Sequence, residues 1–405
     1  MSKHKKNQWN LAWLKSTSVM FIWKVLSSKG AKVYFVGGCV RDSIQGREIK
    51  DIDIATDALP SEVVELAQAV GLKVIKTGFS YGSVSIIIKK DCFEVTTFRS
   101  DLVTDGRHAK VGFSSNILDD ARRRDFTMNA IYMTIDGQIV DPIFGLDDAL
   151  NGRVRFIGNP KKRIHEDYLR VLRYFRFRSI YEEKVDSIDH SMIKTFSDAI
   201  HGIKMLSHDR VWGELSRILL ADNPYLSLKI MEACGILQEI LPLASIEGLH
   251  RLLRIEHEFK LEFKEINRLV VLNVICVKSW VKKFPLKKQQ KKWLNILLLI
   301  CKDPSTLRVK GYKYKTNLVI AAVAVLKANA GAKLHKNEVA EIKDGSIRKF
   351  PVRMSDFVGL FLPSRELGDE LKRLKDVWFA SNLELSRNEL IADLRKNYHK
   401  THLQS

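Results

Sequence analysis

The sequence predicts an α/β head built on one small mixed or antiparallel sheet, followed by an all-helical remainder. Between residues 31 and 140, short segments rich in β-branched residues alternate with a helix-forming segment, as expected for one sheet with covering helices. Beyond about residue 160 this strand pattern stops, and apolar residues recur at helical spacing. We therefore expect four domains, called head, neck, body and tail in chain order: residues 1–150, 151–220, 221–300 and 301–405.

The elements of the head follow from local patterns. Residues 1–30 carry apolar residues near helical spacing and predict one amphipathic helix. The segment LPSEVVELAQAVGL predicts a second helix, with Ser61 as its N-cap and Gly71 at its end. Five short segments predict strands: KVYFVGG, DIDIAT, VSIIIKK, CFEVTTF and AIYMTI.

The charge balance indicates a polyanionic partner. Lys and Arg number 67 against 47 acidic residues, which gives a formal net charge of +20. Such an excess favours nucleic acid, although a generally basic protein would show the same balance. The stretch Lys282–Trp293 contains six lysines and two aromatic residues. Both RNA contact and a solvated helix face remain open for it.

The sequence also predicts a cytoplasmic protein that does not enter a membrane. Its five cysteines are scattered and form no CxxC pair, which suits a reducing compartment and argues against a zinc site. The N-terminus lacks the continuous apolar core of a signal peptide. Apolar runs such as Leu294–Cys301 are too short to span a bilayer.

A pair of glycines, Gly37 and Gly38, directly follows the first predicted strand. Because glycine has no Cβ, the backbone N–H groups there can approach a ligand closely, and phosphate suits such a position. Arg41 follows one helical turn later, where its guanidinium can reach a phosphate or a sugar. A glycine pair alone is more often a plain turn, so the residues that follow decide its meaning.

Two aspartates, Asp51 and Asp53, stand two residues apart in a predicted strand. Side chains alternate along a strand, so both carboxylates face the same side. Neighbouring carboxylates repel each other unless a cation lies between them, and Mg²⁺ prefers such oxygen ligands. The pair therefore predicts a magnesium site for phosphoryl transfer, with a surface pair on an edge strand as the plainer interpretation.

The segment from Gly37 to Thr56 resembles the nucleotide-transfer signature of the polymerase-β-like nucleotidyltransferases. Four later segments resemble, in order, the signatures of the branch that contains the class II CCA tRNA nucleotidyltransferases and the bacterial poly(A) polymerases: Ala121–Tyr132, Asp141–Gly158, Arg163–Phe177 and Leu206–Leu219. The resemblance covers residues 33 to about 220 and implies a polymerase-type catalytic head. It implies that Asp51 and Asp53 are the catalytic metal ligands, and that Gly37, Gly38, Arg41 and Arg124 contact the nucleotide.

Four polar residues of the neck are spaced by three: Asp167, Arg170, Arg173 and Arg176. This spacing predicts one slowly drifting helix face, and the resemblance implies that the face binds the nucleotide. Cytosine and adenine both present an amine donor and a ring-nitrogen acceptor, which Asp167 and Arg170 can pair with, whereas uracil and guanine would mispair. A salt bridge on a solvated helix would show the same spacing, but the preceding motifs favour base selection.

Together these motifs predict a template-independent enzyme that adds CCA to tRNA 3′ ends from CTP and ATP and releases pyrophosphate. The helical half is expected to bind the acceptor and TΨC arms of tRNA, and no obligate protein partner is predicted. A poly(A) polymerase, or an enzyme that adds only CC or only A, remains open as an alternative. Glu94 is either a third acidic group beside the metal or a structural residue. The net charge disfavours a small-molecule nucleotidyltransferase, and a non-catalytic RNA-binding protein would not need both aspartates.

Overall fold

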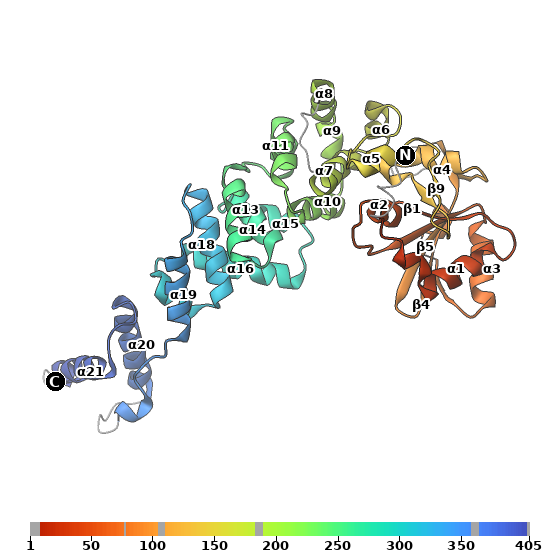
Figure 1. The fold of residues 1–405 in the computed structure, drawn as a ribbon. Helices are drawn as coiled ribbons and strands as arrows, with labels where there is room; N and C mark the ends of the chain where they lie inside the picture. Colours follow the sequence, from red (N-terminus) through yellow and green to blue (C-terminus); the bar gives the residue numbers. More distant parts are fainter. Residues whose placement is uncertain (1–8, 77, 104–109, 183–188, 358–363, 403–405) are drawn as a thin grey trace. The chain divides into compact units, whose positions relative to one another are not determined.

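The chain forms two compact units, Met1–Ile240 and Leu241–Ser405. Figure 1 shows the elements of each in a computed structural model. The structure describes residues 9–76, 78–103, 110–182, 189–357 and 364–402. The division into four domains stays a prediction, because it requires boundaries within each of these units.

The head is built on a mixed sheet of seven strands in the order β3-β4-β5-β2-β1-β8-β9, which confirms the predicted fold class. At its centre β2 (Ile52–Thr56) and β5 (Asp91–Thr97) pair in parallel, whereas the other neighbours pair antiparallel. The remaining strands are β1 (Val33–Val36), β3 (Lys73–Ile75), β4 (Ser83–Ile88), β8 (Tyr132–Met133) and β9 (Ile139–Val140). All five predicted strands are present, and β3 and β9 were not predicted.

The N-terminal segment differs from the predicted single helix. It forms a 3₁₀ turn, η2 (Ala12–Lys15), and then α1 (Thr17–Ser27), because Ser16 between them has extended backbone angles. The indole of Trp13 donates to the Ser43 hydroxyl at 2.7 Å, which anchors the turn to the head. Residues 1–8 of the predicted helix lie outside the described residues.

The second predicted helix is α3 (Pro60–Ala69), but Ser61 is not its N-cap. Proline takes the first helical position, where its missing N–H is no loss, so the cap falls on Leu59. The Glu62 carboxylate accepts the Leu59 N–H at 2.7 Å in place of a cap side chain. Gly71 follows the helix with a φ of +75°, as its predicted end requires.

The other elements of the first unit complete the head and form a helical neck. The head contributes α2 (Gly38–Ile44), η3 (Phe79–Tyr81), a separate two-stranded sheet of β6 (Arg99–Val103) and β7 (Lys110–Phe113), α4 (Ile117–Arg123), η4 (Thr127–Asn129) and α5 (Leu146–Leu150). The neck contains α6 (Pro160–Glu166), α7 (Leu169–Tyr181), α8 (His190–Asp198), α9 (Ile200–Ile203) and α10 (His208–Leu220). The first unit ends with α11 (Tyr225–Ala233) and α12 (Ile236–Ile240), which lie in the predicted body. The central helix α7 packs against α10 and α11.

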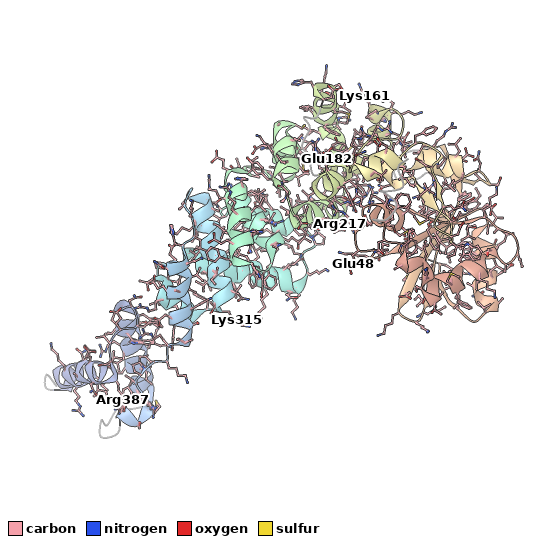
Figure 2. All side chains as sticks on the ribbon, in the orientation of Figure 1. Glu48, Lys161, Glu182, Arg217, Lys315 and Arg387 are labelled. Atoms are coloured by element: carbon pink, nitrogen blue, oxygen red, sulfur yellow. The ribbon has the colours of Figure 1, made fainter. Side chains whose placement is uncertain are left out.

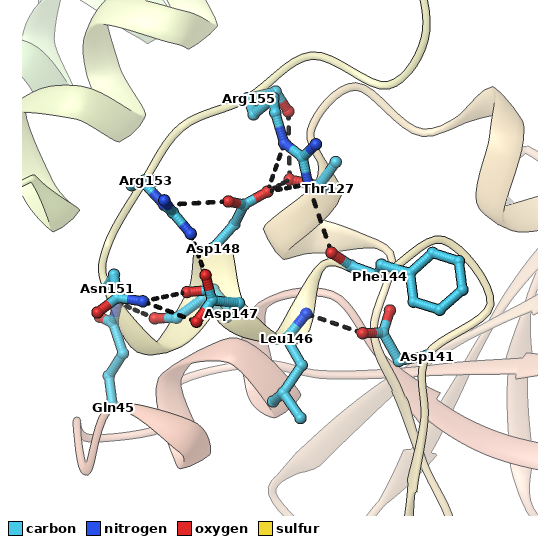
Figure 3. A network of polar contacts seen from close by, with 11 residues as sticks. Gln45, Thr127, Asp141, Phe144, Leu146, Asp147, Asp148, Asn151, Arg153 and Arg155 are labelled. Atoms are coloured by element: carbon cyan, nitrogen blue, oxygen red, sulfur yellow. Dashed lines mark hydrogen bonds and ion pairs between the residues drawn. The ribbon is translucent and has the colours of Figure 1, made fainter. Parts of the chain in front are cut away.

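A polar network fixes the connection between head and neck (Figure 3). The Asp141 carboxylate accepts the backbone N–H groups of Gly145 and Leu146, which starts α5. In the first turn of the same helix the Asp148 carboxylate accepts the Thr127 hydroxyl at 2.6 Å and pairs with Arg155 at 2.7 Å. The network therefore holds η4, and with it the residues around Thr127, against the start of the neck.

The second unit is helical throughout its described elements, as the sequence predicted. Its elements are α13 (Glu247–Phe259), α14 (Lys264–Leu272), α15 (Val277–Lys283), α16 (Lys288–Lys302), α17 (Leu307–Lys313), α18 (Thr316–Asn329), α19 (Lys336–Ile347), η5 (Met354–Phe357), α20 (Ser364–Ala380) and α21 (Arg387–His402). In the part of the chain that the structure describes, no helix has both the length and the apolar character of a membrane span.

Two glycines bring α17 and α19 into direct backbone contact. A methyl group on Gly311 would overlap the carbonyl oxygen of Ile342, and one on Gly345 would overlap that of Arg308. Both overlaps involve backbone atoms, so no side-chain movement can relieve them. The two helices can pack this closely because each presents a glycine to the other.

Gly345→Ala should therefore lower the free energy of unfolding of the second unit by about 1–3 kcal/mol, the usual cost of overpacking. Gly368→Ala is the matched control, because Gly368 lies in α20 with open space around its Cβ position. Replacing an exposed helical glycine by alanine should instead add about 0.5–1 kcal/mol. Urea unfolding of both variants measures the difference, and equal effects would contradict the close helix contact.

Candidate active site

A cavity of about 910 Å³ opens between the head and the neck within the first unit. The head lines it with Gly37, Gly38, Arg41, Arg47, Lys50, Asp51, Asp53, Glu94, Arg124, Asp125 and Asn129. The neck lines it with Arg173, Arg176, Phe177, Ile180, Tyr181, Arg217, Leu220, Ala221 and Asp222. Eight of the ten residues predicted from the sequence thus surround one cavity, the exceptions being Asp167 and Arg170.

Three carboxylates gather on the sheet side of the cavity. Asp53 lies in register with Glu94 on the parallel neighbour β5, and Asp51 directly precedes β2. Burial, followed by the negative charge of Glu94, raises the pKa of Asp53 to about 6, although Arg124 opposes the shift. The two aspartates share one cavity as the two-residue spacing predicted, and Glu94 joins them.

Gly37 leaves space between a carboxylate and a guanidinium. Its φ of +74° and ψ of −126° belong to a region that glycine alone adopts without strain. A Cβ at this position would lie 3.6 Å from Asp53 Oδ2 and 3.7 Å from Arg124 Nη1. The glycine turn therefore lets Asp53 and Arg124 face the same small space, in which a ligand would meet both charges.

Arg124 is held by a buried carboxylate. Asp120 accepts from its Nε and Nη2 atoms at 3.1 and 2.9 Å, and also accepts the Tyr132 hydroxyl at 2.6 Å. Burial opposes ionisation of Asp120, but the Arg124 and Arg123 guanidiniums hold its pKa below the usual range. A guanidinium fixed through two of its nitrogens leaves Nη1 directed at the Gly37 turn.

A chain of buried contacts links Arg41 to the neck. Its Nη1 donates to Asn129 Oδ1 at 2.6 Å, and the Asn129 amide donates to Asp125 Oδ1 at 3.0 Å. Asp125 Oδ2 in turn accepts from Arg173 Nε at 2.7 Å on α7. Arg41 also donates to the Tyr181 hydroxyl at 2.5 Å. Asp125 and Asn129 therefore position two of the predicted nucleotide-binding arginines.

The neck side of the cavity carries a group of arginines with few counter-charges. Arg176 pairs with Glu214 of α10 at 3.1 Å, and Arg173 approaches the same carboxylate at 3.9 Å. Burial lowers the pKa of Arg176 to about 10, and Glu214 only partly offsets this loss. Arg173 and Arg176 therefore line the same cavity as the carboxylates of the head, and they add positive charge to its wall.

The structure corrects the predicted placement of Asp167 on the same helix face as the three arginines. Asp167 follows the end of α6 with an extended φ of −156°, and its carboxylate accepts the Leu169 N–H at 3.1 Å. A short acidic side chain favours such a capping position over a helix interior. Asp167 pairs instead with Arg210 at 2.8 Å, and Arg170 pairs with Glu166 at 2.7 Å.

Several residues of the cavity were not identified from the sequence. Tyr181 and Arg47 contribute through contacts far apart in the chain, since Arg47 lies against the Tyr181 ring. Lys50 and Arg217 line the cavity as exposed cations. Its position next to Asp51 is the signal that could have identified Lys50, whereas Arg217 has the pattern of any polar residue on an amphipathic helix.

A second cavity, of about 800 Å³, lies beside α6 and includes Arg122, Arg155 and Lys162 in its wall. Glu166 is the carboxylate among its described lining residues, and it is already paired with Arg163 and Arg170. Because this cavity lacks paired carboxylates, the chemistry that the sequence predicts belongs to the first one.

Comparisons with known proteins agree with this geometry. Residues 33–155 match the family model described as poly A polymerase head domain, which places the chain among nucleotidyltransferases with this head. Residues 187–246 match a second model, described as a probable RNA and SrmB-binding site of polymerase A. The mouse mitochondrial CCA tRNA nucleotidyltransferase 1 is 30% identical over 402 residues, covering 95% of this chain and 90% of the mouse protein. The chain belongs to this family of CCA-adding tRNA nucleotidyltransferases.

Solved structures show the same fold over nearly the whole chain. The Bacillus stearothermophilus CCA-adding enzyme in complex with CTP has a TM-score of 0.67 at 22% identity and covers 95% of this chain, with 98% of its own chain matched. The Thermotoga maritima CCA-adding enzyme complexed with tRNA has a TM-score of 0.68 at 18% identity. The match covers 97% of this chain and 98% of the Thermotoga chain. The predicted head and helical continuation are therefore confirmed as one known architecture.

Gly37→Ala should reduce nucleotidyl transfer about a hundredfold, because the added methyl would fill the space between Asp53 and Arg124 in which a ligand would meet both charges. Gly30→Ala is the matched control: its φ is +86°, and nothing lies within 4 Å of its Cβ position. Gly30→Ala should lose about 1–2 kcal/mol of stability from its positive φ. Gly37→Ala should lose about 1–3 kcal/mol, because its backbone angles suit glycine alone. Steady-state rates and thermal unfolding separate the two effects. Equal activity losses would show that backbone strain, not the site, is responsible.

Proposed function

We propose that this protein adds CCA to tRNA 3′ ends without a template, using CTP and ATP and releasing pyrophosphate. The observation that carries the proposal is the cavity that joins Asp51 and Asp53 to the arginines of α7. The near full-length similarity to CCA-adding enzymes supports the same conclusion. In this reaction the 3′ hydroxyl of the RNA attacks the α-phosphate of the nucleotide, the bond to the β-phosphate breaks, and pyrophosphate departs.

The residues of the cavity take separate tasks in this proposal. Arg41 and Arg124 bind the triphosphate beside the Gly37–Gly38 turn, where backbone N–H groups can approach phosphate. Arg173 and Arg176 bind the nucleotide from the neck side. Because Asp120 and Asn129 hold the guanidiniums before the substrate enters, little reorganisation is needed to stabilise charge that develops on the phosphate.

Asp51 and Asp53 would hold Mg²⁺, which supplies a positive charge that activates the hydroxyl and stabilises the leaving oxygen. The residues fit such an ion: burial, followed by the charge of Glu94, raises the pKa of Asp53, and the Arg124 and Arg41 guanidiniums offset this only in part. Within the described ranges, no group of three His, Cys, Asp or Glu side chains forms a ready cage for a metal. This suits magnesium, which is commonly bound by two carboxylates and completed by substrate phosphates.

Asp167 and Arg170 are proposed to select the base, as the family resemblance implies. Asp167 would accept from the exocyclic amine, and Arg170 would donate to the ring nitrogen of cytosine or adenine. Their partners Arg210 and Glu166 hold the two side chains 2.8 and 2.7 Å away, and a bound base would share or replace these contacts.

The second unit is proposed to bind the acceptor and TΨC arms of tRNA. Lys282, Lys283, Lys287, Lys288, Lys291 and Lys292 are all exposed, whereas Phe284 and Trp293 are buried. The aromatic residues of this stretch therefore build the core and leave the lysines for phosphate contact. From Ile266 to Lys302 the sequence contains no acidic residue, which favours a polyanionic partner over a merely solvated face.

Poly(A) polymerase activity is the second candidate, because both matching family models are described by that name. A CC-adding or A-adding tRNA enzyme would share the same cavity. The compartment is a separate question: the mouse relative is named mitochondrial, and the cytoplasmic placement stays a prediction.

Extension of a tRNA transcript that lacks its CCA end tests the function. With CTP alone the protein should add two residues, and with CTP and ATP it should add a third and stop. Asp53→Asn should slow addition about a thousandfold, since losing the metal ligand costs about 4 kcal/mol of barrier. Asp91→Asn, an exposed residue at the start of β5 and outside the cavity, is the control and should leave the rate unchanged.

Two results of this assay would contradict the proposal. A long tail made from ATP alone identifies a poly(A) polymerase. Near-normal turnover of Asp53→Asn in magnesium removes the metal assignment while leaving the family membership intact.

Asp167→Ala should lower the discrimination of CTP against UTP by about 1–3 kcal/mol. Cytosine carries an amine where uracil carries a carbonyl, and the substitution removes the carboxylate that would accept from the amine. Arg170→Ala should weaken the binding of CTP and of ATP together. Single-nucleotide addition with each of the four nucleotides measures both effects. Arg210→Ala is the control, since it removes the partner of Asp167 and keeps the acceptor. If Asp167→Ala lowers the incorporation of CTP and UTP in the same proportion, Asp167 has only a structural role in the neck.

A further inference from the structure

Arg217 is an exposed arginine in the wall of the catalytic cavity that the proposed reaction has not used. It lies near the end of α10 and is labelled in Figure 2. Among the described residues, no hydrogen bond or ion pair joins Arg217 to an acidic side chain. The carboxylate of Asp222, just beyond the helix, lines the same cavity but is not paired with it.

The position of Arg217 concentrates positive charge. It lines the same cavity as Arg173 and Arg176, and it lies one helical turn after Glu214, which Arg176 and Arg173 approach at 3.1 and 3.9 Å. Burial, together with the charges of Arg173 and Arg217, lowers the pKa of Arg176 to about 10. A third arginine here increases repulsion within the protein, and an anionic ligand would reverse that cost.

Leu220 adds an apolar contact one helical turn further along α10. It is 52% exposed and lines the same cavity, so it is not part of the core. Residues three apart on a helix are neighbours on its surface. Together the two side chains present a guanidinium for a phosphate and an apolar surface for the adjoining sugar or base.

The reaction brings two anions into this cavity, the nucleotide triphosphate and the end of the RNA. The triphosphate is assigned to Arg41 and Arg124, since their guanidiniums lie 3.7 Å from the Cβ positions of Gly38 and Gly37, beside the glycine turn. Arg217 belongs to a different element, and α10 lies inside residues 187–246, the region that matches the RNA-binding family model. These two facts favour the RNA.

We propose that Arg217 and Leu220 form a primer subsite, in which the guanidinium binds the last phosphodiester of the RNA and Leu220 packs against its terminal nucleoside. This inference rests on the proposed function. The subsite would hold the 3′ end of the RNA after each addition, on the neck side of the cavity and separate from the triphosphate.

Steady-state addition of CMP to tRNA that lacks CCA tests the primer subsite. Arg217→Gln should raise KM for tRNA about tenfold, the effect of losing one charge-assisted hydrogen bond, and leave KM for CTP unchanged. It should also reduce the slope of log KM for tRNA against log salt concentration by about 0.7–1. Arg217→Lys should restore part of the affinity, and Leu220→Ala should raise KM for tRNA without changing the salt slope.

Lys204→Gln is the control, because Lys204 is an exposed cation of the neck that pairs with Glu239 and lies outside the cavity. Its KM values and salt slope should match those of the unmodified protein. A rise in KM for CTP with KM for tRNA unchanged would overturn the subsite and assign Arg217 to the triphosphate. Unchanged values for both substrates, or a fall in kcat alone, would also overturn it. If the unmodified protein adds no CMP to tRNA, the proposed function itself fails, which is a distinct outcome.

Discussion

The geometry of the cavity depends on the buried carboxylate of Asp125. One oxygen accepts from the Phe126 N–H and from Asn129, and the other accepts from Arg173. Burial opposes the charge, but Arg173 and Asn129 hold the pKa of Asp125 below its usual range. A buried charge is costly unless all its partners are in place, so the network strongly favours one arrangement. Through Asn129 the same carboxylate also positions Arg41, so one chain of hydrogen bonds connects the head to α7 of the neck at the site.

Burial and neighbouring like charges disfavour the ionised groups on both sides of the cavity. On the sheet side burial, followed by the charges of Glu94 and Asp51, raises the pKa of Asp53 to about 6. On the neck side burial and neighbouring guanidiniums lower the pKa of Arg176 to about 10. A magnesium–nucleotide complex, as proposed, carries a cation for the carboxylates and a polyanion for the arginines of the head and of the neck. Binding would relieve both repulsions at once, which favours the metal-bound nucleotide over either component alone.

Local sequence patterns predicted the elements of the site well but not their contacts. The two-residue spacing of Asp51 and Asp53 was enough to bring them to one cavity, because strand periodicity is a property of the backbone. The contact of Arg41 with Asn129 spans 88 residues, and its contact with Tyr181 spans 140. No local period contains such information. For Asp167 the local pattern itself was misleading. Its spacing matched a helix interior, but its short side chain accepts the Leu169 N–H at the start of the next helix.

This correction changes how the proposed base selection would work. With Asp167 between two helices and paired with Arg210, and Arg170 paired with Glu166, the selecting groups depend on α6, α7 and α10 together. Glu166 also pairs with Arg163, which donates to the backbone carbonyls of Arg123 and Arg124 at 2.5 and 2.7 Å. The groups proposed to read the base are thus joined, through Arg163, to the segment that carries the proposed triphosphate contact. Under the proposed roles, a shift of α6 would move both groups and would couple base choice to triphosphate binding.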